Sequence, residues 1–84
     1  MSTVKIDRRH VIAARNLLQM TQADLASAAG IATESVTNLE TGKTKPFQST
    51  LDKIRDALER RGIEFMNGDS PGVRLHGDRA VIPV

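Results

Sequence analysis

The sequence of 84 residues contains no cysteine, tryptophan or tyrosine, and only two phenylalanines. Without cysteine, the chain has no disulfides, no thiolate metal ligands and no cysteine nucleophile. His10 and His76 lie near opposite ends of the chain, so a zinc site is excluded as well. We therefore expect no metal and no other cofactor. The hydrophobic fraction is 39%, so the core must be built from Leu, Ile, Val and Ala, which favours a compact helical bundle.

Long hydrophobic runs are also missing. No apolar stretch approaches the roughly 18 residues that a membrane-spanning helix needs, and no charged-then-apolar leader opens the chain. We therefore expect no membrane contact and a protein that stays in the cytoplasm, where it is made. A chain of this length is too short for two independent cores, so it should form one small domain.

Net charge is only +2, but the charges are unevenly distributed along the chain. Residues 21–40 carry three acids and no base, whereas residues 41–50 hold Lys43 and Lys45 and no acid. A basic loop fits an anionic partner, and it fits ordinary solvated surface charge equally well. The charge pattern alone leaves both interpretations open.

Apolar residues recur with helical spacing in four segments. The predicted helices cover about residues 8–18, 22–29, 33–41 and 48–61. Asp7 is the expected N-cap of the first helix, Thr21 and Asp24 form a capping box at the second, and Gly30 and Gly42 end the second and third. Of the remaining side chains, His10 is expected on the surface, and Met20 and Phe47 between the helices or in the core.

After Gly62 the pattern changes to strict alternation of apolar and charged residues. Residues 63–65 and 73–75 alternate in this way, and residues 67–72 between them are rich in turn-forming types. This pattern predicts a β-hairpin. An apolar tail, residues 81–84, follows it.

The most informative segment is residues 22–42, where two short helices are separated by only three residues. Gly30 permits a sharp turn, Ala26 is small enough for the helices to cross closely, and Ile31 can fill the angle from inside. This is the physical requirement for a helix-turn-helix. One face of the second helix of this pair then stays free, and its side chains are Thr33, Glu34, Thr37, Asn38 and Thr41, with Ser35 at the margin.

The stretch TQADLASAAGIATESVTNLETGKTKP resembles the helix-turn-helix of phage-repressor and Cro-type (XRE-like) regulators. It shares their Thr-Gln entry, a small residue four positions after the Gln, the glycine of the turn, and a Glu-x-Gly-Lys end. The resemblance covers roughly residues 8–61. It implies a mainly α fold: a four-helix repressor-like DNA-binding domain over residues 1–62, followed by a short C-terminal β-hairpin and tail over residues 63–84.

The resemblance also implies roles for individual residues of the motif. The helix over residues 33–41 would read the major groove, and helix 22–29 would lie against the DNA backbone. The implied base-reading residues are Thr33, Glu34, Ser35, Thr37 and Asn38. The implied phosphate contacts are Thr21, Gln22, Thr41, Lys43 and Lys45. Arg15 and Glu40 would form a structural ion pair.

Some of these side chains have simpler explanations. Glu34 can complement the positive N-terminus of its helix, worth about 0.3–1 kcal/mol, or it can accept from a cytosine amine. Many relatives carry Gln or Arg where Thr33 and Glu34 stand here, so the operator sequence does not follow from the resemblance. Arg8 and Arg9 are expected to be solvated, and an arm-like contact with DNA is the alternative.

We expect a transcriptional regulator that binds double-stranded DNA, as a homodimer on a two-fold operator. The dimer would form through the hairpin and tail, by way of Ile63, Phe65, Val73, Leu75, Val81 and Ile82. Alternatively, the hairpin only covers helix 48–61 within one chain. A second function hypothesis is an antitoxin or anti-activator whose C-terminal segment also binds a protein partner. An enzyme is rejected, since no nucleophile elbow, phosphate-binding glycine loop or metal cluster is present.

Overall fold

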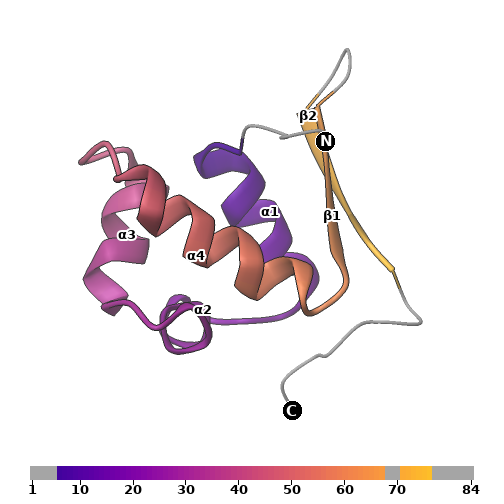
Figure 1. The fold of residues 1–84 in the computed structure, drawn as a ribbon, viewed down its shortest axis with the longest axis horizontal. Coiled ribbons are helices and arrows are strands. Elements are labelled where there is room, and N and C mark those ends of the chain that lie inside the picture. The colour runs from indigo at the N-terminus through magenta and orange to yellow at the C-terminus, as the bar shows by residue number, and fades with distance from the viewer. Residues whose placement is uncertain (1–5, 68–70, 77–84) are drawn as a thin grey trace.

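The computed structural model describes residues 6–67 and 71–76. Four helices come first, followed by two strands (Figure 1). The elements are α1 (Arg8–Leu17), α2 (Gln22–Ala29), α3 (Thr33–Thr41), α4 (Gln48–Glu59), β1 (Ile63–Asn67) and β2 (Pro71–Leu75). The predicted mainly helical fold with a C-terminal hairpin is confirmed. Helices α1 and α4 end one and two residues before the predicted bounds, because Leu18 and Arg60 are their C-caps.

Two of the helices begin with reciprocal capping boxes. Thr21 Oγ1 accepts from the Asp24 N–H at 3.0 Å, and the Asp24 carboxylate accepts from the Thr21 N–H at 3.0 Å. Asp7 accepts from the N–H groups of Arg9 and His10 at the start of α1. Partial burial acts to raise the pKa of Asp7, but hydrogen bonds from the Arg9 side chain and from the His10 and Arg9 backbone outweigh it and lower the pKa to about 2. The Asp7 cap therefore stays charged down to strongly acidic pH.

Three of the helices end in the same way, on a residue with positive φ. After α2 and α3 this residue is Gly30 (φ 72°) and Gly42 (φ 74°), as predicted. After α1 it is Gln19, with φ 58°. At each end a later backbone N–H reaches back five residues, as in the bond from the Met20 N–H to the Arg15 carbonyl (3.0 Å). These are Schellman-type ends, which turn the chain sharply while satisfying the last helical carbonyls.

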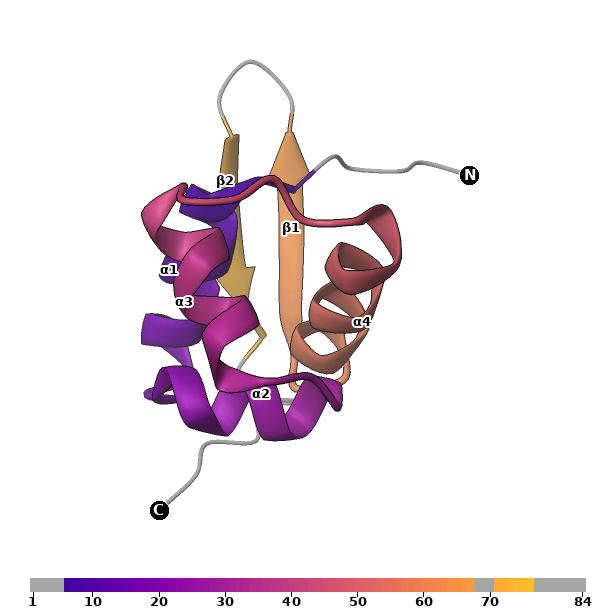
Figure 2. The same cartoon turned by 90° about the vertical axis from the view of Figure 1, so that its left-hand side faces the viewer.

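The strands form an antiparallel pair in which Ile63 lies opposite Leu75 and Phe65 opposite Val73. These four apolar residues pack on the helical core, and Glu64 and Arg74 pair with each other on the opposite face. The hairpin forms a layer behind the helices, with β2 against α1 and β1 beside α4 (Figure 2). It therefore covers α1 as well as the helix over residues 48–59.

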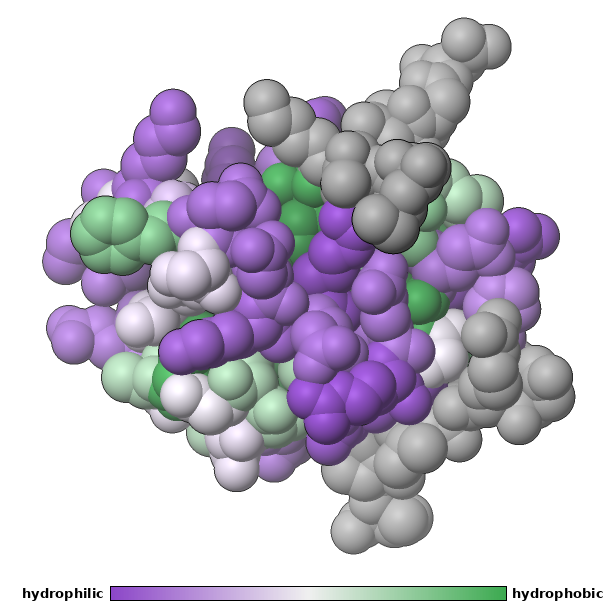
Figure 3. Space-filling view, in the orientation of Figure 1, coloured by the Kyte–Doolittle hydropathy of each residue, from purple (hydrophilic) through white to green (hydrophobic). Residues whose placement is uncertain are grey.

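The core is aliphatic, with one aromatic residue from the hairpin. Leu18, Leu25, Ile54, Leu58, Val11 and Val36 are its largest fully buried side chains. Met20 is buried with them, as predicted, and Phe65 and Ile63 of the hairpin belong to the same cluster. The hairpin thus completes the core that the helices share. The face seen in Figure 3 is mostly hydrophilic, with apolar colour confined to separate areas.

His10 was expected on the surface, and this prediction was wrong. Its side chain is buried between α1 and the hairpin, and its ring meets Phe65 edge-on at 6.0 Å between centroids. His10 Nδ1 accepts from the Asp7 N–H at 3.1 Å, in the place where a capping box usually has Glu or Gln. The same Nδ1 lies 3.2 Å from Asp7 Oδ1, and Nε2 lies 3.4 Å from the Met66 carbonyl oxygen.

Phe47 was expected in the core or between the helices, and this prediction was also wrong. It is the N-cap of α4, in extended backbone, and 80% of its surface is exposed. The helical spacing that turns Ile54 and Leu58 inward does not apply to a residue that precedes the first turn.

Candidate nucleic-acid interface

The corner between α2 and α3 is built from small and apolar residues. Ala26 and Val36 are buried, and Ile31 is half-buried against the core. The left-handed conformation of Gly30 redirects the chain within three residues, and nothing lies within 4 Å of where its Cβ would be. The requirement for glycine here is therefore conformational rather than steric. The result is a helix-turn-helix in which α3 packs across α2.

Helix α3 buries one side and presents the other. Val36, Leu39 and Glu40 are buried, whereas Thr33, Glu34 and Thr41 are exposed. The three remaining candidates are half-buried: Ser35, Thr37 and Asn38. The structure therefore brings all the predicted base-reading residues onto one partly exposed face of a single helix.

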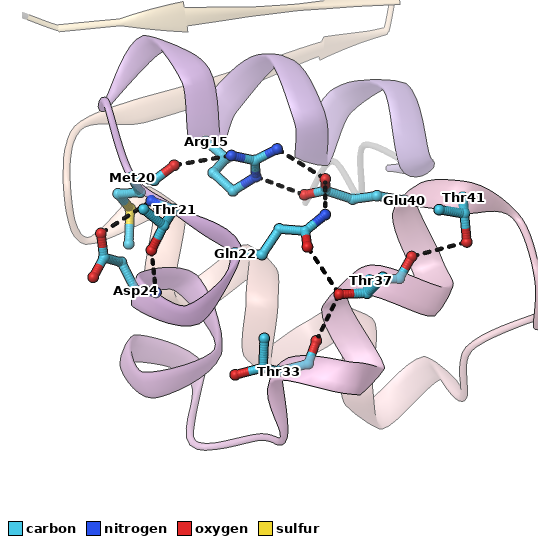
Figure 4. Close-up of polar contacts among 9 residues, drawn as sticks. All are labelled: Arg15, Met20, Thr21, Gln22, Asp24, Thr33, Thr37, Glu40 and Thr41. Carbon is cyan, nitrogen blue, oxygen red and sulfur yellow. Dashed lines mark hydrogen bonds and ion pairs between the residues drawn. The ribbon is translucent and has the colours of Figure 1, made fainter.

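Behind this face, Arg15 and Glu40 form a bidentate pair that ties α1 to α3 (Figure 4). Arg15 Nε donates to Glu40 Oε2 at 2.8 Å, and NH2 donates to Oε1 at 2.9 Å. NH1 of the same guanidinium donates to the Met20 carbonyl at 2.9 Å. Desolvation acts to raise the pKa of Glu40, but the bonds from Arg15 and Gln22 prevail and hold this pKa below its usual value. The carboxylate is therefore buried in its charged form.

Gln22 links this ion pair to the exposed face of α3. Its Nε2 donates to Glu40 Oε1 at 2.9 Å, and its Oε1 accepts from the Thr37 hydroxyl at 2.8 Å (Figure 4). Both ends of the amide are thus fixed by protein groups, and one N–H remains available for an outside acceptor. Sequence reasoning missed these contacts. A signal was nevertheless present in the sequence. The buried Glu40 carboxylate has more lone pairs than Arg15 alone can satisfy, which indicates a further donor nearby, here at the start of α2.

The hydrogen bonds within the protein determine which donors and acceptors the side chains on this face still have available for a ligand. The Thr37 hydroxyl gives its proton to Gln22, and the Thr41 hydroxyl gives its proton to the Thr37 carbonyl at 2.9 Å. Both can still accept a hydrogen bond. The Asn38 amide makes no hydrogen bond to any described residue. Its donor and acceptor are both free at the middle of the helix.

The loop that follows α3 supplies positive charge. Lys43 and Lys45 are exposed, and no described residue forms an ion pair with either. Thr21, the N-cap of α2, is also exposed, and its hydroxyl accepts within the capping box, which leaves its proton free. Exposed cations therefore follow the end of α3, and an exposed donor stands at the start of α2.

Residues 11–65 match the family described as Helix-turn-helix, which is 55 of the 84 residues. The chain belongs to this helix-turn-helix family. It is accordingly a DNA-binding regulator of the phage-repressor and Cro type, as the motif in residues 21–46 predicts. No curated protein matches its sequence closely enough to count as a relative.

Other features of this helix-turn-helix protein bear on the remaining predictions. Within residues 6–67 and 71–76, no group of three or more His, Cys, Asp or Glu residues could hold a metal ion. In the same part of the chain, no helix has the length and apolar character to span a bilayer.

The residues predicted to dimerise lie in different environments. Ile63 and Phe65 are buried in the core of their own chain, whereas Val73 and Leu75 are half-buried. Val81 and Ile82 lie outside the described residues.

Proposed function

We propose that this helix-turn-helix protein is a sequence-specific regulator that inserts α3 into the major groove of duplex DNA. The observation that carries the proposal is that the amide of Asn38, on the exposed side of α3, has no hydrogen-bond partner within residues 6–67 and 71–76. An amide of this kind suits the paired acceptor and donor of adenine N7 and N6. Thr33, Glu34, Ser35 and Thr37 flank it and complete the set of proposed base contacts.

The shape of the face supports a close approach to DNA. Its side chains are short, apart from Glu34, so the backbone of α3 can come near the base edges. Because the corner at Gly30 holds α3 across α2, the start of α2 would lie beside one sugar–phosphate strand. Glu34 would select cytosine through its N4 amine, since a carboxylate is otherwise repelled in the groove.

Phosphate contacts would come from Thr21, Gln22, Thr41, Lys43 and Lys45. Thr21 would donate its hydroxyl proton and Gln22 its second Nε2–H, because the partners of both side chains leave these donors free. Thr41 would have to exchange its bond to the Thr37 carbonyl for a phosphate oxygen. The two lysines would supply charge that is independent of sequence.

Selection of bound fragments from a random duplex library, at a stated salt concentration, tests the proposal. On the selected site we expect Asn38→Ala to weaken the free energy of DNA binding by about 1–3 kcal/mol and to reduce the sequence preference at one base pair. Lys43→Ala should weaken all sequences alike and lower the salt dependence by about one ion. Each variant is the control for the other. If Asn38→Ala leaves discrimination unchanged, the placement of α3 is wrong.

We further propose that two copies bind a two-fold operator, because a single module of this size buries little DNA surface. Ile63 and Phe65 are committed to the core, so the contact would use the outer edge of β2. The His76 N–H donates to the Gly62 carbonyl across the hairpin. In an antiparallel ladder the N–H groups of Val73 and Leu75 then point outward, where a second β2 or the tail with Val81 and Ile82 can pair.

Sedimentation of the full chain at micromolar concentration tests this dimer. We expect a concentration-dependent dimer, and Val73→Pro should weaken it, since proline removes one outward N–H and is tolerated at a sheet edge. A chain that stays monomeric alone and on DNA contradicts the dimer. Stoichiometric co-purification of a monomer with another protein would favour the antitoxin or anti-activator hypothesis instead. The protein would act in the cytoplasm, and it would be associated with the nucleoid when it is bound to DNA.

A further inference from the structure

Arg8 and Arg9 are neighbours at the start of α1, but they differ in their ion-pair partners. Arg9 NH2 lies 3.0 Å from Asp7 Oδ2, so the charge of Arg9 is paired with the N-cap of its own helix. Arg8 is exposed and forms no hydrogen bond or ion pair with any described residue. Arg9 is therefore paired locally, whereas Arg8 has no charged partner in the part of the chain that the structure describes.

The free guanidinium lies at the far end of the proposed recognition helix. A Cβ built on Gly42 would stand 3.8 Å from the Cδ, Nε and NH1 atoms of Arg8. Gly42 is the C-cap of α3 and directly precedes Lys43. Arg8 thus extends from α1 across the backbone at the end of α3, although 33 residues separate the two positions in the sequence.

Arg8, Lys43 and Lys45 together form a cluster of three exposed cations, which we call the basic cluster. It joins two elements, α1 and the loop between α3 and α4, and residues 41–50 contain no acid to balance it. Exposed cations that have no ion-pair partner among the described residues attract a polyanion. Since Gly42 and Lys43 directly follow Thr41 at the end of α3, duplex DNA bound at the exposed side of α3 is the polyanion that would reach this cluster.

We propose that Arg8 is a DNA-phosphate ligand that completes the basic cluster, so that α1 as well as the helix-turn-helix contacts the duplex. The inference rests on the proposed function. A guanidinium at the end of α3 would meet the sugar–phosphate backbone and not the base edges, because only the front of a recognition helix enters the groove. Arg8 then adds affinity and fixes the angle of the domain on DNA without adding sequence preference.

A purely structural role for Arg8 is the competing explanation. A cation at the C-terminus of α3 complements the partial negative charge of the helix end, and α3 has no basic residue in its own last turn. In that case removing Arg8 would lower thermal stability and leave the salt dependence of DNA binding unchanged. The two explanations therefore differ in a measurable quantity.

The test is the affinity of the full chain for a selected duplex and a scrambled duplex, measured over a range of NaCl concentrations. For Arg8→Ala we expect the salt slope to fall by about one and the affinity for both duplexes to drop about fivefold at 0.15 M salt. Arg8→Lys should keep the slope. The matched control, Arg9→Ala, removes an adjacent but paired cation and should change the slope by much less.

Several results would overturn the inference. An unchanged slope in Arg8→Ala, equal losses in Arg8→Ala and Arg9→Ala, or a lower melting temperature with no change in slope would each exclude a phosphate contact. If the unaltered chain does not bind duplex DNA at all, the proposed function fails together with the inference. If the unaltered chain binds, Asn38→Ala relaxes discrimination, and Arg8→Ala keeps the slope, only the role of Arg8 is wrong.

Discussion

Arg15 and Glu40 show how much of this fold depends on one pair of side chains. Glu40 is almost fully buried and Arg15 largely so, and the pair joins α1 to the helix that faces outward. A buried ion pair adds little net stability, but breaking one strands a charge in the core. In this protein the stranded carboxylate would keep only the bond from Gln22, and Gln22 also holds Thr37 in place.

We therefore expect Arg15→Ala to lower the free energy of unfolding by about 3 kcal/mol, the lower end of the range for a buried pair, since Arg15 is not fully buried. Arg60→Ala is the matched control, because Arg60 forms an exposed pair with Asp56 one turn earlier in α4 and should cost less than about 1 kcal/mol. Urea denaturation followed by circular dichroism measures both. Equal losses in the two variants would mean that the Arg15–Glu40 pair is open to solvent in solution.

At the scale of whole elements, the helix boundaries were largely predictable and the long-range contacts were not. Capping boxes and left-handed glycines are local signals, so Thr21, Gly30 and Gly42 could be assigned from the sequence. The exposed side of α3 followed from periodicity alone. The burial of His10 depends on Phe65 in a distant strand, and no spacing within the first helix encodes that contact. The exposure of Phe47 likewise follows from the tertiary path of the chain before α4.

Gln19 was missed for a related reason. It occupies the left-handed position that glycine fills after α2 and α3, and a glutamine gives no signal for such a turn. A non-glycine residue in this conformation costs about 1–2 kcal/mol in backbone strain. Glycine avoids this strain, but it loses more conformational entropy on folding, so the net gain in stability from a glycine at this position is smaller.

We expect Gln19→Gly to raise the free energy of unfolding by about 0.5–1 kcal/mol, with an increase in melting temperature. Gly30→Ala should lower stability by a similar amount, because the new methyl group meets no atom and only the strain remains. Thermal melts of the two variants give shifts of opposite sign. Shifts of the same sign would contradict the shared role of these helix ends.

At the scale of the whole molecule, the hairpin and the four helices share one hydrophobic core. Ile63 and Phe65 are as buried as the helical core, and Phe65 covers His10. Burial of two such side chains is worth about 3–6 kcal/mol, a large share of the total stability of a small domain. The sequence places the hairpin after Gly62 but cannot show that the core extends across this boundary.

A chain that ends at Gly62 should therefore lose cooperative unfolding, although it retains every residue of the helix-turn-helix. A chain that ends at His76 is the control, since it keeps both strands, and it should melt close to the full-length protein. Circular dichroism during heating distinguishes the two. A sharp transition in the shorter chain would mean that the helices fold without the hairpin.

The dependence of the core on its final strands has a consequence for synthesis in the cell. Strands β1 and β2 follow the helices in the sequence, so the ribosome makes the helices before it adds the residues that enclose His10. We expect a product that terminates before β1 to carry the helix-turn-helix without a stable core, and proteases to degrade it. Incomplete copies of this kind would then not compete with the whole protein for DNA.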